Sequence, residues 1–226
     1  MTIIEAQNIH RSFGTGRLFT HVLKGIDITV DQGEFIAIMG KSGAGKSTLM
    51  YQLSVLDHPT EGSLTVDGVN VRALSEREQT EFRLRTLGYV FQDYALVPDL
   101  SARENIMIPL LMRGEKWEEA KRNADKSLDD VGLPGKYNNL PAELSGGEQQ
   151  RVSVARALAG KPKIIFADEP TANLDSISGG AIIDLLGDLH KQGQTIVMVT
   201  HEEEYTKYCN RIINMEDGRI TDEHRP

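Results

Sequence analysis

The sequence has a single cysteine, no long apolar run and no excess of basic residues. One cysteine, Cys209, excludes an internal disulfide, and no Cys/His spacing typical of a metal site is present. We interpret Cys209 as a structural thiol in a reducing compartment. No apolar run approaches the roughly 20 residues that span a bilayer, and Met1 to Arg11 lack the pattern of a secretory signal. We therefore expect a chain that is soluble by itself, with any membrane role supplied by a partner.

The balance of charge is acidic. The 226 residues carry a formal net charge of -8, with 26% charged and 39% hydrophobic residues. A dedicated nucleic-acid binder would usually present a basic face, so no nucleic-acid partner is expected. The length suits one large domain, or a core with a subdomain, that buries a sizeable apolar interior.

Strand-like and helix-like segments alternate along the chain. Residues 3–11 and 22–30 alternate between apolar and polar side chains, which predicts an N-terminal antiparallel sheet. Short apolar runs typical of strands buried on both faces occupy residues 35–39, 163–167 and 195–199. Helices are predicted over residues 46–56, 75–85, most of 101–160, and 178–191. Ser101 and Glu104 have the spacing of a capping box at the start of the third of these segments. Alternating strands and helices of this kind imply a mostly parallel sheet with helices on both faces. Ligands of such folds bind beyond the carboxyl ends of the strands.

A glycine-rich segment follows the first buried strand and matches G-x-x-x-x-G-K-[ST]. It consists of Gly40, Lys41, Ser42, Gly43, Ala44, Gly45, Lys46, Ser47 and Thr48. Glycines let successive backbone N–H groups point at phosphate oxygens, and the following helix adds its positive end. We expect Lys46 to reach the β- and γ-phosphates of a nucleotide and the Ser47 hydroxyl to ligate Mg²⁺, although the loop alone would also suit kinases and GTPases.

Two carboxylates end the second buried strand. Asp168 suits a direct or water-mediated hold on Mg²⁺. Glu169 comes next and therefore points differently, which makes it the candidate general base that polarises the attacking water. Alone, the pair could also be an acidic turn before Pro170. A phosphate loop more than a hundred residues earlier favours the catalytic interpretation.

A third motif carries a family resemblance. Its residues are Leu144, Ser145, Gly146, Gly147 and Glu148, followed by Gln149 to Arg151. This run resembles the signature of ABC ATPases. Ser145 and Glu148 also have the spacing of a capping box, and a Ser-Gly-Gly helix start is itself an anion site. The resemblance implies that this site takes the γ-phosphate of ATP held by the opposite subunit.

The remaining motifs follow in the order of the same family. Gln92 resembles the Q-loop glutamine, which contacts Mg²⁺ and senses a transmembrane partner. His201 resembles the switch histidine at the γ-phosphate, although a lone histidine at a strand end is otherwise more often structural. Phe13 takes the place of the aromatic that stacks on adenine, where tyrosine is common. The D-loop is matched by Asn173, Leu174 and Asp175.

The resemblance covers about residues 2–222. It implies an α/β fold of the P-loop NTPase (RecA-like) type, with a mostly parallel sheet and an N-terminal antiparallel β-subdomain, over residues 1–85 and 161–226. A helical subdomain that carries the signature is inserted over residues 86–160. It also implies hydrolysis of ATP with Mg²⁺ in a head-to-tail homodimer, where each site joins the phosphate loop of one chain to the signature of the other.

The stretches Leu96 to Pro98, Arg103 to Ile106 and Pro141 to Leu144 resemble ATPases of the lipoprotein-release, macrolide- or peptide-export and cell-division group. This implies a protein held at the inner face of the membrane by permease-like subunits that contact the region of Gln92. The alternative is a non-transport ABC ATPase with soluble or nucleic-acid partners. Those usually carry coiled-coil insertions or a second ATPase, and neither is present. The motifs together also argue against a P-loop phosphotransferase or a nonhydrolytic binding module.

Overall fold

The buried apolar runs of the sequence form strands. β3 (Phe35–Met39), β7 (Ile164–Asp168) and β8 (Thr195–Val199) are buried at every residue, which confirms the prediction for these segments. The computed structural model describes residues 1–226, except for the side chain of Arg17. The chain divides into two compact units, residues 1–83 with 190–226, and residues 84–189.

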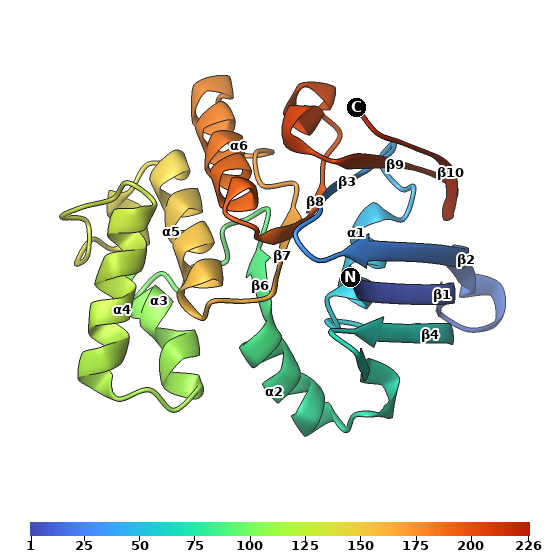
Figure 1. Ribbon diagram of the computed structural model, residues 1–226, viewed down its shortest axis with the longest axis horizontal. Helices are drawn as coiled ribbons and strands as arrows, with labels where there is room; N and C mark the ends of the chain where they lie inside the picture. Colours follow the sequence, from blue (N-terminus) through green and yellow to red (C-terminus); the bar gives the residue numbers. More distant parts are fainter. The chain divides into compact units, whose positions relative to one another are not determined.

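The first unit begins with the predicted antiparallel sheet. Its strand order is β2-β1-β4-β5, and these strands run over Thr20–Asp31, Thr2–Phe13, Glu61–Val66 and Val69–Asn70. β1 pairs antiparallel with both β2 and β4, and the three strands lie side by side in Figure 1. Ile26, Ile28 and Val30 of β2 are buried in strict alternation, whereas the buried residues of β1 alternate less regularly because its register shifts at several positions.

A second set of strands in this unit carries the glycine-rich segment. β3 pairs in parallel with β8 and with β9 (Arg211–Glu216), and β10 (Arg219–His224) pairs antiparallel with β9. Helix α1 (Lys46–Leu53) ends three residues before the predicted boundary, because Val55 has a positive φ of 59°. The short 3₁₀ helices of this unit cover Gly16–Leu18, Val71–Ala73 and Glu203–Tyr208. Helix α2 (Glu76–Thr86) leads into the second unit.

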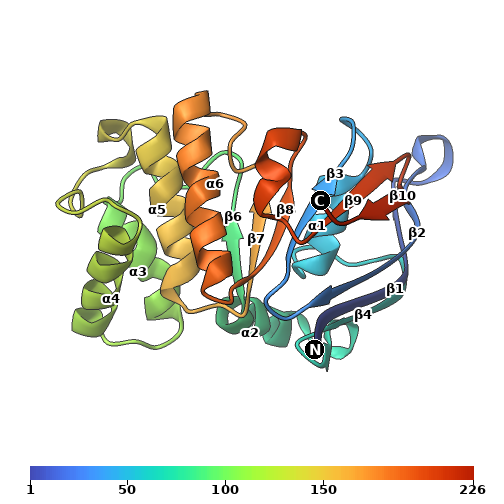
Figure 2. The same cartoon turned by 45° about the horizontal axis from the view of Figure 1, so that its top comes forward.

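The second unit holds most of the helices. They are α3 (Ala102–Met112), α4 (Trp117–Asp130), the 3₁₀ helix Pro141–Glu143, α5 (Gly146–Ala159) and α6 (Ser176–Lys191). The first three α-helices pack against one another (Figure 2), beside the parallel pair β6 (Leu87–Val90) and β7. The helical subdomain predicted over residues 86–160 lies within this unit.

Local hydrogen bonds explain where the helices begin. Ser101 and Ser145 cap α3 and α5 in the predicted capping boxes. α6 begins at Ser176, two residues before the predicted start, because the Asp175 carboxylate accepts from the N–H groups of Ile177 and Ser178, at 3.0 and 2.9 Å. These bonds lower the pKa of Asp175, that from Ser178 most strongly.

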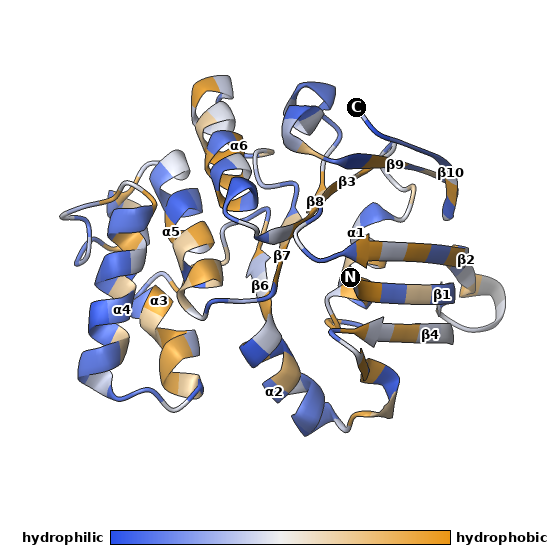
Figure 3. Ribbon diagram, viewed as in Figure 1, coloured by the Kyte–Doolittle hydropathy of each residue, from blue (hydrophilic) through white to orange (hydrophobic). Residues whose placement is uncertain are grey.

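Hydropathy follows the packing. Strands β3, β7 and β8 are apolar, whereas α4 is largely polar (Figure 3) and buries the small stripe of Ala120, Ala124 and Leu128. No helix in the described part of the chain is long and apolar enough to cross a membrane. Burial raises the pKa of the Cys209 thiol to about 12, so it stays a neutral apolar group.

The β9–β10 turn supports the phosphate loop. The Gly218 N–H donates to Ala44 O at 3.0 Å, and Gly218 O accepts from the N–H of Lys24 at 2.9 Å. Gly218 has φ +77°, and a Cβ there would lie 2.0 Å from Val22 O.

We expect Gly218→Ala to lower the free energy of unfolding by about 3 kcal/mol or more, because a positive φ and a backbone clash add. The matched control is Gly68→Ala, in a second Asp-Gly turn with φ +74° but no atom within 4 Å of the added Cβ. It should cost only about 1–2 kcal/mol. Urea unfolding of both variants measures the difference, and equal losses would show that the turn does not need close contact with Val22.

Candidate nucleotide site

The glycine-rich segment forms a loop between β3 and α1. Gly40, Gly43 and Gly45 all have positive φ, and a Cβ on Gly40 would lie 2.3 Å from Met215 O. Gly45 caps the N-terminus of α1, so the positive end of the helix follows the loop directly. The glycines are thus required by conformation and, at residue 40, by close packing.

The Lys46 side chain reaches back to the start of this loop. Its Nζ donates to Gly40 O at 2.8 Å and to Lys41 O at 3.3 Å, and the residue is only 7% exposed. The charge is therefore held against the loop. A cavity of about 490 Å³ lies beside the loop and is lined by residues 40–44, 214–217 and Thr221. This volume lies within the range of small-molecule sites, about 300–1,000 Å³.

Two further predicted residues belong to the first unit. His201 lies two residues after the end of β8 and is exposed. The N–H of the intervening Thr200 donates to Ile38 O in β3 at 3.2 Å. This bond ties the residue before His201 to the strand that enters the phosphate loop. Phe13 ends β1 with 44% of its surface exposed, and the Arg11 guanidinium lies 4.3 Å from its ring centroid.

The carboxylate pair belongs to the second unit. Asp168 ends β7 and is 5% exposed, and its Oδ2 accepts from the Tyr89 hydroxyl at 3.5 Å. Glu169 has a φ of 43°, which is strained for a residue with a side chain. This left-handed residue turns the chain out of the strand directly after Asp168.

The Gln92, D-loop and signature segments meet within the second unit. The Asn173 amide donates to Gln92 O at 3.1 Å and to Asp93 Oδ1 at 3.0 Å. Tyr94 Oη donates to Asn173 O at 3.2 Å. A Cβ on Gly146 would lie 2.9 Å from the Tyr94 hydroxyl and 3.5 Å from Leu174. The other two segments therefore pack closely against Gly146, and a side chain at this position would displace the Tyr94 hydroxyl.

The signature begins helix α5. Ser145 Oγ accepts from the Glu148 N–H at 3.3 Å, and Glu148 Oε2 accepts from the Ser145 N–H at 2.9 Å. The latter bond, followed by the bond from Lys136, lowers the pKa of Glu148. Leu144 is buried and Ser145 is exposed. The capping box predicted from the sequence is therefore present, at a helix start where Ser145 is exposed.

Tyr94 and Gln150 were missed from the sequence. Gln150 is fully buried on α5, and its Nε2 donates to Pro170 O at 2.7 Å and to Phe91 O at 3.4 Å. It thus joins the signature helix to the segments that carry Glu169 and Gln92. The place of Gln150 in the run that resembles the signature was its only signal, and nothing in the local pattern marked Tyr94.

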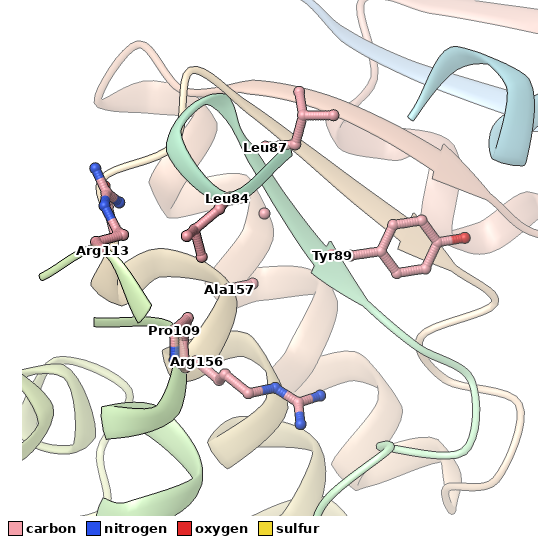
Figure 4. Close-up of a pocket in the computed structure, with 9 residues that line it drawn as sticks. Leu84, Leu87, Tyr89, Pro109, Arg113, Arg156 and Ala157 are labelled. Carbon is pink, nitrogen blue, oxygen red and sulfur yellow. The ribbon is translucent and has the colours of Figure 1, made fainter. Parts of the chain in front are cut away.

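A smaller cavity of about 180 Å³ lies in the second unit (Figure 4). Pro109, Arg113 and Ala157 line it, and the Arg113 guanidinium donates to Gly160 O. The Tyr89 ring points away from Pro109 and Ala157. This volume is below the range of about 300–1,000 Å³ that is typical of small-molecule sites.

A loop of this composition, closed by a buried lysine between a buried strand and a helix, defines a P-loop nucleotide-binding protein of the α/β class. The family model described as ABC transporter matches residues 23–172. The chain belongs to the ABC transporter family and is an ATPase of the ABC type, as the motifs predicted.

Curated relatives match most of the chain. An uncharacterized ABC transporter ATP-binding protein of Methanocaldococcus jannaschii is 46% identical, over 97% of this chain and 98% of that protein. The lipoprotein-releasing system ATP-binding protein LolD of Aquifex aeolicus is also 46% identical, over 89% and 90%. The macrolide export ATP-binding/permease protein MacB of Neisseria meningitidis is 44% identical, but the chain spans only 34% of its length.

A solved dimeric ATP-binding cassette in a post-hydrolysis state, bound to ADP and phosphate, is similar over 98% of both chains, with a TM-score of 0.91 and 38% identity. These comparisons confirm the P-loop fold and the expected group of ABC ATPases. They favour the transport-type ATPase over the non-transport alternative.

Proposed function

We propose that the chain is the ATP-hydrolysing subunit of a membrane export or release complex and works as a head-to-tail pair of identical chains. The main support is that the signature, the Gln92 segment and the D-loop segment pack together within one unit. Ser145, at the start of the signature helix, is exposed. The similar cassettes whose structures are dimeric support the second copy.

ATP binds at the phosphate loop in this proposal. The backbone N–H groups of residues 40–48 and the start of α1 cradle the phosphates. Lys46 exchanges its bonds to loop carbonyls for bonds to the β- and γ-phosphates. The exposed face of Phe13 stacks on adenine.

Mg²⁺ would be held by Ser47, Gln92 and Asp168. These residues offer hydroxyl, amide and carboxylate oxygens, which are the donors that Mg²⁺ takes. When bound, the ion neutralises charge on the phosphates during phosphoryl transfer.

Hydrolysis needs a base and a sensor of the γ-phosphate. Glu169 polarises the attacking water, and its strained backbone supports that role because strain is retained at functional positions. His201 contacts the γ-phosphate. The opposite chain supplies the signature residues Leu144 to Glu148, and its Asn173, Leu174 and Asp175 complete the paired interface.

Movement of the chain during the ATP cycle is transmitted to integral, permease-like membrane subunits. The proposed contact is the segment around Gln92, where Gln92 and Val97 are exposed. Two relatives are named for lipoprotein release and macrolide export, which supports a partner of that kind and a position on the inner face of the membrane. Substrate choice then belongs to the partner.

Affinity purification from membranes tests this assignment. We expect the wild-type chain to recover an integral membrane protein that stimulates its ATPase activity when the two are reconstituted. Val97→Glu should lose most of that recovery, whereas Leu56→Glu, at a similar exposure of 44% against 40%, should keep it. Recovery of soluble proteins alone, or equal losses in both variants, would contradict the proposed contact.

A further inference from the structure

Arg11 and Asp57 form a bidentate ion pair beside the proposed adenine contact. Arg11 Nε donates to Asp57 Oδ2 at 2.7 Å and Arg11 Nη2 to Oδ1 at 2.8 Å. Both side chains are about a quarter exposed, 23% and 28%. Parallel, charge-assisted bonds of this kind fix the plane of a guanidinium as well as its position.

Asp57 is itself fixed to the helix that follows the phosphate loop. Gln52 of α1 donates from Nε2 to Asp57 Oδ2 at 3.0 Å, and the His58 N–H donates to Oδ1 at 2.8 Å. Gln52 is fully buried, and its Oε1 has no hydrogen-bond partner among the side chains and backbone that the structure describes. A reversed amide would turn that oxygen toward the carboxylate. The bond to Asp57 therefore sets the orientation of Gln52 although it leaves a buried oxygen unpaired.

The same guanidinium covers one face of Phe13. Arg11 Cζ lies 4.3 Å from the ring centroid, within the range of a cation–π contact. Phe13 remains 44% exposed, so one side of the ring is occupied and surface is left for a base. A cation on one face also withdraws electron density from the ring, which favours stacking of an electron-rich purine on the other.

We propose that Arg11 is a positioning residue for recognition of the nucleobase, held by Asp57 and Gln52. This inference rests on the proposed contact between Phe13 and adenine. The connection runs from α1, whose first residue is Lys46, through Gln52, Asp57 and Arg11 to the ring. It fixes the distance between the group that binds phosphate and the group that binds the base, so the two ends of one nucleotide are recognised as a unit.

The test compares a ligand that has a base with one that has none. We expect Arg11→Gln and Asp57→Asn each to weaken ATP binding about fivefold to twentyfold, the lower part of what base–aromatic stacking supplies. Inhibition by inorganic tripolyphosphate, which occupies only the phosphate loop, should stay within about twofold. Arg11→Lys should restore part of the loss, because it keeps a cation over the ring but not the bidentate pair.

The matched control is Arg211→Gln. Arg211 forms an ion pair with Glu34 in the same unit at 2.9 Å and does not contact Phe13. It should leave the ratio of ATP to tripolyphosphate affinity unchanged. If Arg11→Gln weakens both ligands equally, the pair is only structural and the inference fails.

Phe13→Ala tests the contact between Phe13 and adenine separately from the positioning role of Arg11. If it leaves the affinity ratio unchanged, the adenine contact itself is wrong and the inference falls with it. If Phe13→Ala lowers the ratio but Arg11→Gln and Asp57→Asn do not, the contact stands and only the positioning role is overturned.

Discussion

Replacement of Glu169 by Gln is expected to lower steady-state ATP turnover at least about a hundredfold, within the usual contribution of a general base. The substitution keeps the size of the side chain and its capacity to form hydrogen bonds, but it replaces the carboxylate that accepts a proton with an amide that does not. ATP binding should be retained because the phosphate loop and Lys46 are untouched. The variant should therefore accumulate as an ATP-bound pair of chains, measured by phosphate release and by size-exclusion chromatography with ATP and Mg²⁺.

Glu118→Gln provides the control for this experiment, because Glu118 lies in the first turn of α4 and takes no part in the site. It should leave turnover and the distribution of monomer and dimer unchanged. A Glu169→Gln variant that stays monomeric at saturating ATP and Mg²⁺ would contradict the paired arrangement. One that dimerises but still turns over at the wild-type rate would instead remove Glu169 from the role of base.

Replacement of Lys46 by Met is expected to weaken ATP binding by about a hundredfold or more, since charge-assisted hydrogen bonds contribute roughly 1.5–3 kcal/mol each. Lys46 is 7% exposed and already directed across the loop, so little conformational entropy is lost when phosphate replaces the carbonyls as acceptor. Isothermal titration calorimetry with ATP measures the effect.

Lys41→Met removes the same charge from the same loop, but Lys41 is exposed. We expect a loss of no more than about threefold, in line with a screened surface charge. Similar losses in both variants would show that net charge, rather than the direction of the Lys46 ammonium, governs binding. A thermal melt of each variant shows whether the loop still folds when Gly40 O loses its donor.

Features encoded within a few residues were predicted well. The runs 35–39 and 195–199 became fully buried strands with those boundaries, and the Ser-x-x-Glu spacings at 101 and 145 became capping boxes. Both depend on contacts inside one segment, which a pattern records directly. The helix after the D-loop was placed late because Asp175 was considered only as part of a motif, although an aspartate is a strong helix cap.

Features that join distant segments could not be predicted. Gln150 contacts backbone that lies 20 and 59 residues away, and Arg11 pairs with a carboxylate 46 residues further along the chain. No local periodicity marks such partners, because they are set by how the strands and helices pack. The roles assigned to Phe13, Gln92, Asp168, Glu169 and His201 remain predictions that the experiments above address.

The contacts that support the phosphate loop come from segments that are synthesised much later than the loop itself. Residues 40–48 leave the ribosome early, but the N–H that pairs with Ala44 O belongs to Gly218, and the carbonyl packed against Gly40 belongs to Met215. The neighbours of β3, which are β8 and β9, also come more than 150 residues later. A nascent chain thus carries the complete motif long before it has the partners that support it, so the loop gains these contacts only after residue 218 has been made.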